Sequence, residues 1–239
     1  MVSVAVISFD VWGTLLDTKK MFGLIAEKLA ERLSSRKVDA DTVERIILRV
    51  YERCKARRRL GEVDGFNIVV ESQNLLAQEL GITQEEVINA IEEAFSSADS
   101  NQIMYPEVAS TIQLLNKLGF RMGVIGNTLF WSSTLTRELL DRLGIAKYFE
   151  VMLFADATRI NKPDRRIFLM FAKHMDVEPS RVAHVGDSVI EDVGGALSAG
   201  MKAIYIDRGR RDKGKVVLKE LGLAVVSELS QVIDVLEEL

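Results

Sequence analysis

The chain has 239 residues, a length that suits one large domain or two small ones. Its 31 basic and 35 acidic side chains give a formal charge of −4, so the overall charge does not point to a nucleic-acid partner. With only His174, His184 and Cys54, the sequence excludes a disulfide framework and a Cys/His zinc site, and any catalysis would rest on carboxylates, basic side chains and hydroxyl groups.

The first predicted element is a β-strand over residues 4–9, an apolar run that ends at Asp10. This run is too short for the apolar core of a signal peptide. No part of the sequence approaches the roughly 18 consecutive apolar residues of a membrane-spanning helix. Together with the single thiol, these features predict a cytoplasmic protein without a membrane partner.

Residues 18–104 are predicted to form a bundle of about four helices. All three prolines lie beyond residue 105, so proline does not interrupt this stretch. Asp41 is a candidate N-cap, and Thr83 with Glu86 matches a capping box. Apolar residues recur at helical spacing in four groups: Met21, Ile25, Leu29 and Leu33; Val43, Ile47, Val50 and Tyr51; Val70, Leu75, Leu76 and Leu80; and Val87, Ile91 and Phe95.

The rest of the chain alternates between predicted strands and helices. Strands are expected at 121–125, 151–154, 182–185, 203–206 and 223–226, and helices at about 107–118, 132–143, 164–175, 190–199, 215–221 and 228–238. This alternation, with near-continuous apolar strands, predicts an α/β fold: a Rossmann-like, doubly wound parallel sheet with helices on both faces. We predict a core domain of residues 1–17 and 105–239, with the helical bundle of residues 18–104 inserted after the first strand.

Polar residues follow the predicted strands, at the edge where a parallel sheet binds its ligands. Asp10 follows the first strand and Asn127 the second, Asp187 and Asp192 follow the strand at 182–185, and Lys162 precedes the helix at 164–175. A set of carboxylates opposed by one lysine suits a hard cation such as Mg²⁺, which prefers oxygen ligands. It also suits a small anionic substrate placed between the cation and the lysine.

These residues, in this order, resemble the haloacid dehalogenase superfamily, and the resemblance covers nearly the whole chain. The inserted helices lie where that family carries its helical cap. The four matching motifs are Asp10 with Gly13, Thr14 and Leu15; Asn127; Lys162; and Gly186 and Asp187 with Asp192, reinforced by Gly195, Ala196, Ala199, Gly200 and Met201. The resemblance implies a hydrolase with a Rossmann-like core and a cap domain.

The resemblance also implies a role for each motif residue. Asp10 would be the nucleophile, forming an aspartyl ester that water hydrolyses, and Thr14 would orient it. The carboxylates of Asp10 and Asp187 and the backbone carbonyl of Trp12 would hold Mg²⁺. Trp12 would also face the substrate.

The same resemblance gives roles to the residues that balance and receive charge. Lys162 would offset the charge of the nucleophile and of the transferring group. Asp192 would position Lys162 or the water ligands of the metal. Asn127, with the neighbouring residues Gly126 and Thr128, would receive the substrate anion.

The sequence departs from the phosphatase pattern of this family at two positions. Phosphatases of the family usually have a second aspartate two residues after the nucleophile as general acid, and here that residue is Trp12. General acid help is typically worth about 10²–10⁴ in rate. The second motif normally has Ser or Thr before the asparagine, and here it has Gly126, although Thr128 could substitute.

Three interpretations follow for function. The aromatic residue at position 12 is similar to what the 2-haloacid dehalogenase branch has at this position. In that branch the aspartate attacks carbon without a metal. However, Asp187 without a cation would repel a carboxylate substrate and a departing halide. We therefore favour a Mg²⁺-dependent phosphohydrolase acting on a small phosphate ester, with the dehalogenase as the alternative and a weakly active or non-catalytic ligand-binding protein as the third reading.

Several residues outside the motifs have both a structural and a functional interpretation. Phe130 and Trp131 would line a substrate pocket or pack at a helix start. His184 is expected to be a satisfied core residue, whereas Asp17 would serve the hinge into the cap or act as a spare proton donor. The basic run Arg53, Lys55, Arg57, Arg58 and Arg59 would be a solvated face or contact an anionic substrate.

Overall fold

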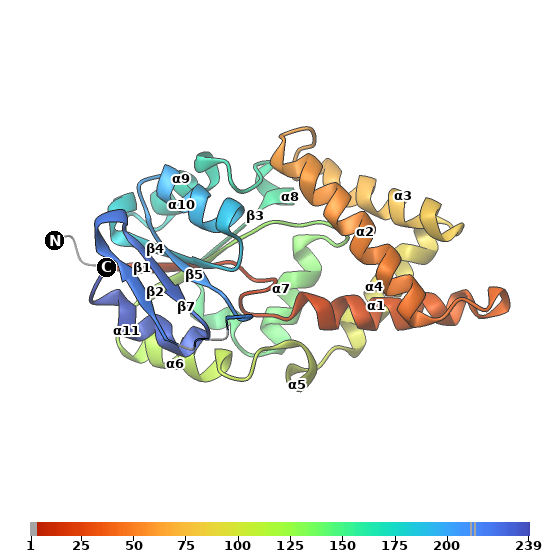
Figure 1. The fold of residues 1–239 in the computed structure, drawn as a ribbon, viewed down its shortest axis with the longest axis horizontal. Helices are drawn as coiled ribbons and strands as arrows, with labels where there is room; N and C mark the ends of the chain where they lie inside the picture. Colours follow the sequence, from red (N-terminus) through yellow and green to blue (C-terminus); the bar gives the residue numbers. More distant parts are fainter. Residues whose placement is uncertain (1–3, 211, 213) are drawn as a thin grey trace.

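A parallel β-sheet forms one half of the molecule in the computed structural model, which describes residues 4–210, 212 and 214–239 (Figure 1). Within these residues the sheet has seven strands in the order β3-β2-β1-β4-β5-β7-β6, and β6 alone pairs antiparallel, with β7. In chain order the strands are β1 (Val6–Phe9), β2 (Arg121–Gly126), β3 (Val151–Phe154), β4 (Val182–Gly186), β5 (Lys202–Ile206), β6 (Val216–Leu218) and β7 (Leu223–Val226).

The strand order explains where a ligand site can form. The chain runs outward from β1 through β2 to β3, then returns to β4 on the other side of β1. Strands β1 and β4 are fully buried, as their continuous apolar sequences require. The reversal between β1 and β4 is a topological switch point, where the loops after both strands separate and leave a crevice. The predicted doubly wound α/β fold is confirmed.

Helices cover both faces of the sheet (Figure 1). On one face Phe168 and Phe171 pack against Ile125 and Val182. On the other face Ile112 contributes to the larger apolar core. The helices of this half are α6 (Val108–Lys117), α7 (Ser133–Arg142), α8 (Ala155–Thr158), α9 (Arg165–His174), α10 (Gly195–Ser198) and α11 (Val232–Leu236), with short 3₁₀ turns at Ala146–Tyr148, Pro179–Arg181 and Leu229–Gln231.

The described chain between β1 and α6 is helical, as predicted, and forms the other half of the view in Figure 1. Helix α1 packs against α2 and α4, and α3 packs against α2 and α4. Their bounds are α1 (Thr18–Arg32), α2 (Ala40–Arg59), α3 (Asn67–Leu80), α4 (Gln84–Ser97) and the short α5 (Ser100–Ile103), with a 3₁₀ turn at Ser34–Arg36.

The ends of these helices correct two details of the sequence prediction. The capping box of Thr83 and Glu86 is confirmed. The N-cap of α2 is Asp39, whose side chain accepts from Thr42 N at 2.8 Å, and Asp41 lies in the first turn instead. Val70 was expected in the apolar stripe of α3 but is exposed, because the helix buries Ile68 instead.

The two connections between the helices and the sheet half run side by side. Leu16 and Met104 form an isolated antiparallel bridge, and Asp17 N donates to Ile103 O at 2.8 Å. The Asp17 carboxylate caps α1 by accepting from Lys19 N and Lys20 N. Asp17 is therefore engaged at the junction, as the hinge interpretation expected. The domain boundaries at 17/18 and 104/105 stay a prediction.

Residues 215–221 do not form the predicted helix. They form β6 followed by a 3₁₀ turn, Lys219–Leu221, which Gly222 ends with a positive φ of 61°. Strand β6 supplies hydrogen-bond partners to β7, whose outer edge would otherwise be open, and this tertiary demand overrides local propensity. Similarly, the predicted helix at 190–199 is a π-helical turn, Val189–Gly194, continued by α10.

No helix among the described residues combines the length and apolar content needed to cross a bilayer.

Candidate active site

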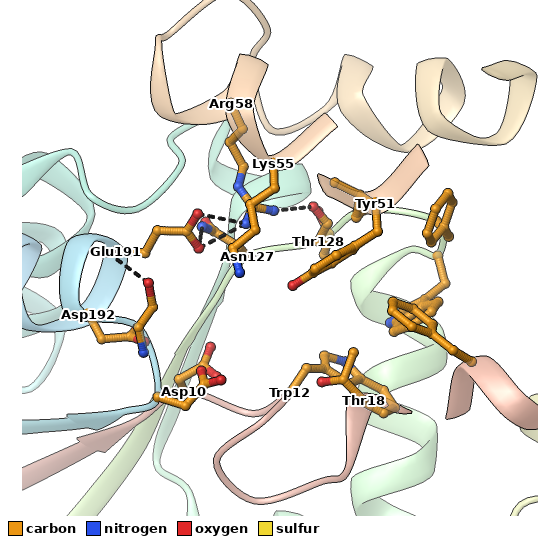
Figure 2. Close-up of a pocket in the computed structure, with 16 residues that line it drawn as sticks. Asp10, Trp12, Thr18, Tyr51, Lys55, Arg58, Asn127, Thr128, Glu191 and Asp192 are labelled. Atoms are coloured by element: carbon orange, nitrogen blue, oxygen red, sulfur yellow. Dashed lines mark hydrogen bonds and ion pairs between the residues drawn. The ribbon is translucent and has the colours of Figure 1, made fainter. Parts of the chain in front are cut away.

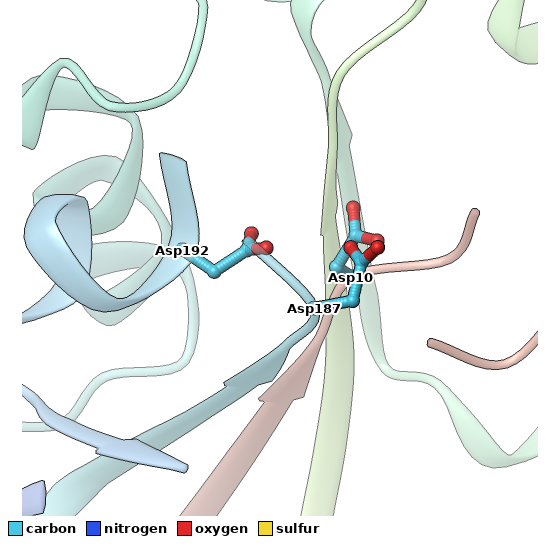
Figure 3. Close-up of side chains that lie close together, drawn as sticks. All are labelled: Asp10, Asp187 and Asp192. Atoms are coloured by element: carbon cyan, nitrogen blue, oxygen red, sulfur yellow. The ribbon is translucent and has the colours of Figure 1, made fainter. Parts of the chain in front are cut away.

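The switch point brings the strand-end residues of three neighbouring strands to one rim. Phe9 of β1 is in register with Val124 of β2 and with Val185 of β4. Asp10 and Asp187 therefore emerge next to each other, because each follows its strand by one or two residues (Figure 3). Asp10 N donates to Val185 O at 2.9 Å, which fixes the start of the Asp10 loop on β4.

Lys162 lies beneath this rim and is only 1% exposed. Its Nζ donates to Asp10 Oδ1 at 2.7 Å, to Asp192 Oδ1 at 2.6 Å and to Ile125 O at 2.7 Å. Burial alone would lower the pKa of Lys162, but the charges of Asp10 and Asp192 outweigh it and raise this pKa above its usual value. The lysine is therefore a fixed positive charge that holds two carboxylates in place.

Asp192 is held from several sides. Besides Lys162, it accepts from Ser188 N at 2.9 Å and contacts His184 Nε2 at 3.1 Å. The charge of Lys162 keeps the pKa of Asp192 low despite burial, and burial lowers the pKa of His184. A neutral His184 therefore donates from Nε2 to Asp192 while its Nδ1 accepts from Ser8 Oγ at 2.9 Å. The expectation of a satisfied core histidine is confirmed, and its partner is a site residue.

Three carboxylates converge above Lys162. Oxygen atoms of Asp10, Asp187 and Asp192 lie within 4.8 Å of one another (Figure 3). Burial, together with the charge of Asp192, raises the pKa of Asp10 to about 6, although Lys162 opposes the shift. Asp187 is exposed as a residue, but the packing around its carboxylate and the charge of Asp10 raise its pKa to about 8. This crowding of negative charge is what a bound cation would relieve.

The loop after Asp10 is shaped to approach Asp187 closely. Gly13 has a φ of 97°, and a Cβ atom on it would lie 2.2 Å from Asp187 Oδ2. Only glycine fits this position, because any side chain would displace the carboxylate. Thr14 follows, and its hydroxyl donates to Asp10 Oδ2 at 3.3 Å. The oxygen donor set and its tight cradle fit a small hard cation such as Mg²⁺.

Asn127 of the second motif lines the pocket and has protein partners, and its expected role in receiving a substrate anion stays a prediction. The Asn127 side chain accepts from Lys162 N at 2.8 Å and donates to Lys162 O at 3.1 Å, so it secures the loop that carries the lysine. A Cβ atom at Gly126 would lie 2.6 Å from the Phe154 ring, so a serine or threonine does not fit there. The Thr128 hydroxyl is buried, lines the pocket and has no hydrogen-bond partner among the described residues.

Trp12 lines the pocket and contacts residues of both halves. Its indole Nε1 donates to Thr136 Oγ1 at 3.2 Å, and its ring meets Trp131 edge-on with centroids 4.8 Å apart. Phe95 packs on the other side of this pair. Because the indole N–H is committed to Thr136, Trp12 supplies no proton to the pocket. Phe130 and Trp131 are buried and also line the pocket.

The basic run on α2 separates into residues with distinct partners. Arg58 makes two hydrogen bonds to Glu191, at 2.8 and 3.0 Å, and donates to Thr128 O at 3.2 Å (Figure 2). Arg59 donates to the same Glu191 at 3.0 Å. Arg57 instead pairs with Glu62 and Glu71 at the surface. The solvated-face interpretation thus fails for Arg58, which joins the helical half to the sheet half.

Glu191 is the site residue that the sequence interpretation missed. It is 5% exposed, and the Arg58 guanidinium holds the pKa of its carboxyl below the usual value despite burial. Its position just before Asp192 is visible in the sequence, but its burial against α2 depends on how the two halves pack.

The pocket over these residues encloses about 50 Å³ and is bordered by both halves (Figure 2). Its floor includes Asp10 and Asp187, and aromatic side chains form one wall. A wider recess of about 550 Å³ adjoins it and shares Thr18, Tyr51 and Lys55 with it. The lining of the recess also includes Asp187.

A family model described as haloacid dehalogenase-like hydrolase matches residues 4–200. The chain belongs to this family. The resemblance inferred from its motifs and the expectation of a hydrolase are thus confirmed, and the three carboxylates with Lys162 form the candidate active site of this haloacid dehalogenase-like hydrolase.

Individual relatives carry phosphatase and dehalogenase names. The chain is 33% identical over 134 residues to a glyceraldehyde 3-phosphate phosphatase of Methanothermobacter thermautotrophicus, covering 55% of this chain and 58% of that protein. It is 27% identical to that of Pyrococcus furiosus, covering 98% and 93%. The chain spans about half the length of several curated relatives it matches. The L-2-haloacid dehalogenase of Xanthobacter autotrophicus shares the fold, with a TM-score of 0.71, 18% identity and 98% coverage of both chains.

The carboxylate cluster predicts that the stabilisation of the fold by Mg²⁺ depends on pH. A carboxyl whose pKa is raised on folding holds its proton more tightly in the folded protein, so its ionisation favours unfolding. With the pKa of Asp187 near 8, stability without metal should fall between pH 6.5 and 8.5. Mg²⁺ should therefore raise the melting temperature more at pH 8.5 than at pH 6.5, measured against EDTA-treated protein. Asp187→Asn should weaken both the loss of metal-free stability with rising pH and the pH dependence of the Mg²⁺ effect. An equal rise in melting temperature with Mg²⁺ at the two pH values would contradict the prediction.

The ion pair between Arg58 and Glu191 should stabilise the packing of α2 on the sheet half. Removing one partner of a buried pair typically costs about 3–5 kcal/mol, so Glu191→Met should lower the free energy of unfolding by about 3 kcal/mol in urea. Glu71→Met, which removes a partner of the surface residue Arg57, should cost less than about 1 kcal/mol. Equal losses for the two variants would show that the buried pair has no special role.

Proposed function

We propose that this protein is a Mg²⁺-dependent phosphohydrolase that cleaves small phosphate esters through an aspartyl-phosphate intermediate. The observation that carries the proposal is the cluster of Asp10, Asp187 and Asp192, whose oxygen atoms lie within 4.8 Å of one another above a buried lysine. A site with this much negative charge repels an anionic substrate unless a cation is bound. With a cation, the same site attracts a phosphate group.

Asp10, Asp187 and the backbone carbonyl of Trp12 would hold the metal. When bound, Mg²⁺ would neutralise the carboxylates and the phosphoryl oxygens. Gly13 supports this assignment, because a Cβ atom there would lie 2.2 Å from Asp187 Oδ2, and its absence lets the loop that carries Trp12 lie against Asp187. Asp192 would position Lys162, as its 2.6 Å hydrogen bond indicates.

Asp10 is suited to act as the nucleophile. Lys162 fixes Oδ1 and Thr14 approaches Oδ2, so the carboxylate has one orientation relative to the pocket. An oxygen of Asp10 would bond to phosphorus while the bond from phosphorus to the alcohol oxygen breaks. Water would then attack phosphorus, releasing phosphate and restoring Asp10. Lys162 would balance negative charge in both steps.

The substrate phosphoryl group would find donors in the second motif despite the absence of a hydroxyl at position 126. The Thr128 hydroxyl is buried at the pocket without a partner in the described chain, and burying such a group without a partner is costly. A phosphoryl oxygen would satisfy it. We further propose that residues 18–104 act as the cap domain over a core of residues 1–17 and 105–239, with Leu16 and Met104 at the hinge.

Metal-dependent phosphate release tests the proposal. Wild-type protein should release phosphate from p-nitrophenyl phosphate with Mg²⁺ and not with EDTA, and Asp10→Asn should abolish this release because it removes the nucleophile. Asp39→Asn is the matched control, since asparagine also caps a helix and Asp39 lies outside the pocket. Its rate should equal that of wild type.

The same preparations distinguish the other two interpretations. Halide release from 2-chloropropionate without metal would replace the phosphatase by a dehalogenase, the alternative that the aromatic residue at position 12 favours. No turnover of either compound, with ligand binding intact in Asp10→Asn, would indicate a binding protein.

The missing general acid should appear in the leaving-group dependence. General acid help is worth about 10²–10⁴ in rate for a poor leaving group. Trp12→Asp should therefore raise the rate ratio of ethyl phosphate to p-nitrophenyl phosphate at least about tenfold. Trp12→Asn loses the same aromatic contacts with Trp131 and Phe95 but carries no acidic proton, so its ratio should remain that of wild type. Equal ratios in the two variants would refute the argument.

A further inference from the structure

Lys55 differs from its neighbours in the basic run on α2. Arg57, Arg58 and Arg59 each pair with a carboxylate. Among the described residues, Lys55 has no ion pair and no hydrogen bond, and its Nζ lies 5.2 Å from the centre of the Tyr51 ring. It lines both the pocket and the adjoining recess.

Tyr51 lies one helical turn before Lys55 and faces the same way. Figure 2 shows both side chains reaching from α2 into the pocket on the side opposite Asp10. The Tyr51 hydroxyl has no hydrogen bond within the described chain, and burial raises the pKa of the phenol, so it remains a donor. The phenol of Tyr51 at i and the ammonium of Lys55 at i+4 thus present two donors without hydrogen-bond partners to the same space.

We infer that Lys55 and Tyr51 form a subsite for a second anionic group, carried by the leaving group of a small phosphate ester. The inference rests on the proposed phosphohydrolase function. Asp10 and the metal ligands occupy the floor of the pocket, so the transferring phosphoryl group lies there and the leaving group points toward α2. An anionic oxygen on it would accept charge-assisted hydrogen bonds from the Lys55 ammonium and from the Tyr51 hydroxyl.

The space beneath α2 is bordered by Thr18, Phe22 and Trp131, among others. A carboxylate or a second phosphate on the leaving group would supply the anion. Lys55 and Tyr51 are the donors that α2 presents to this space without a hydrogen-bond partner in the described chain.

Matched esters test the inference. 2-Phosphoglycolate and ethyl phosphate differ only in a carboxylate in place of a methyl group, so the ratio of their kcat/KM values measures recognition of the second anion. Hydrogen bonds to charged groups are worth about 1.5–3 kcal/mol, so Lys55→Met should lower this ratio about 10- to 100-fold, mainly through KM. Lys55→Arg, which keeps the charge, should retain most of the preference, and Tyr51→Phe should lose part of it.

Controls separate this inference from the proposed function and from misfolding. Arg53→Met removes an exposed charge from the same helix and should leave the ratio unchanged. Ethylene glycol bisphosphate carries a second phosphate where 2-phosphoglycolate carries a carboxylate. A Lys55-dependent preference for either compound over ethyl phosphate supports the subsite, and the better substrate identifies the anion that the subsite binds. The inference is overturned if wild type shows no preference, or if Lys55→Met lowers both esters equally. Failure of wild type to hydrolyse p-nitrophenyl phosphate with Mg²⁺ would instead overturn the proposed function.

Discussion

The buried ammonium group of Lys162 is the interaction on which the rest of the site depends. It joins Asp10 after β1, Ile125 O on β2 and Asp192 after β4, so one side chain ties together three adjacent strands at their carboxyl ends. An unpaired ammonium could not remain charged in this position, and two adjacent carboxylates could not remain ionised without it. The loop that carries Lys162 is held in turn by Asn127, and Asp192 is held by His184, which Ser8 orients through Nδ1. Residues far from the pocket floor thereby determine the orientation of Asp10.

The two halves of the molecule meet around a second charge cluster. Glu191 belongs to the π-helical turn that also places Asp192, and it receives Arg58 and Arg59 from α2. The position of the helical half is therefore coupled, through adjacent residues, to the carboxylate that supports Lys162. The aromatic cluster of Trp12, Trp131 and Phe95 adds an apolar contact on the other side of the pocket. Opening this arrangement would require breaking a buried ion pair and separating aromatic rings, which favours the closed pocket when no ligand competes.

The sequence predicts the floor of this site well, because the relevant residues follow apolar strands whose parallel arrangement brings their ends together. Asp10, Asp187 and Asp192 follow from this rule, Lys162 from its place before the next predicted helix, and the helical insertion from its helical periodicity. What could not be predicted depends on packing between distant segments. The burial of Glu191 requires α2 as a partner, and β6 forms because β7 offers an open edge. Likewise, the sequence indicates only that Gly126 lacks the hydroxyl usual at its position. In the fold, the Phe154 ring occupies the space that a side chain there would need.

The two departures from the phosphatase pattern have a common physical consequence. Trp12 and the Gly126–Phe154 pair each place aromatic surface where the usual pattern has a polar side chain. In the proposed phosphohydrolase, substrate recognition would then rely on polar groups elsewhere around the pocket. The Thr128 hydroxyl and the Lys55 and Tyr51 donors on α2 are among those without a hydrogen-bond partner in the described chain. In the proposed phosphohydrolase, recognition would therefore involve the helical half, so that binding of a charged leaving group and closure of the pocket would stabilise each other.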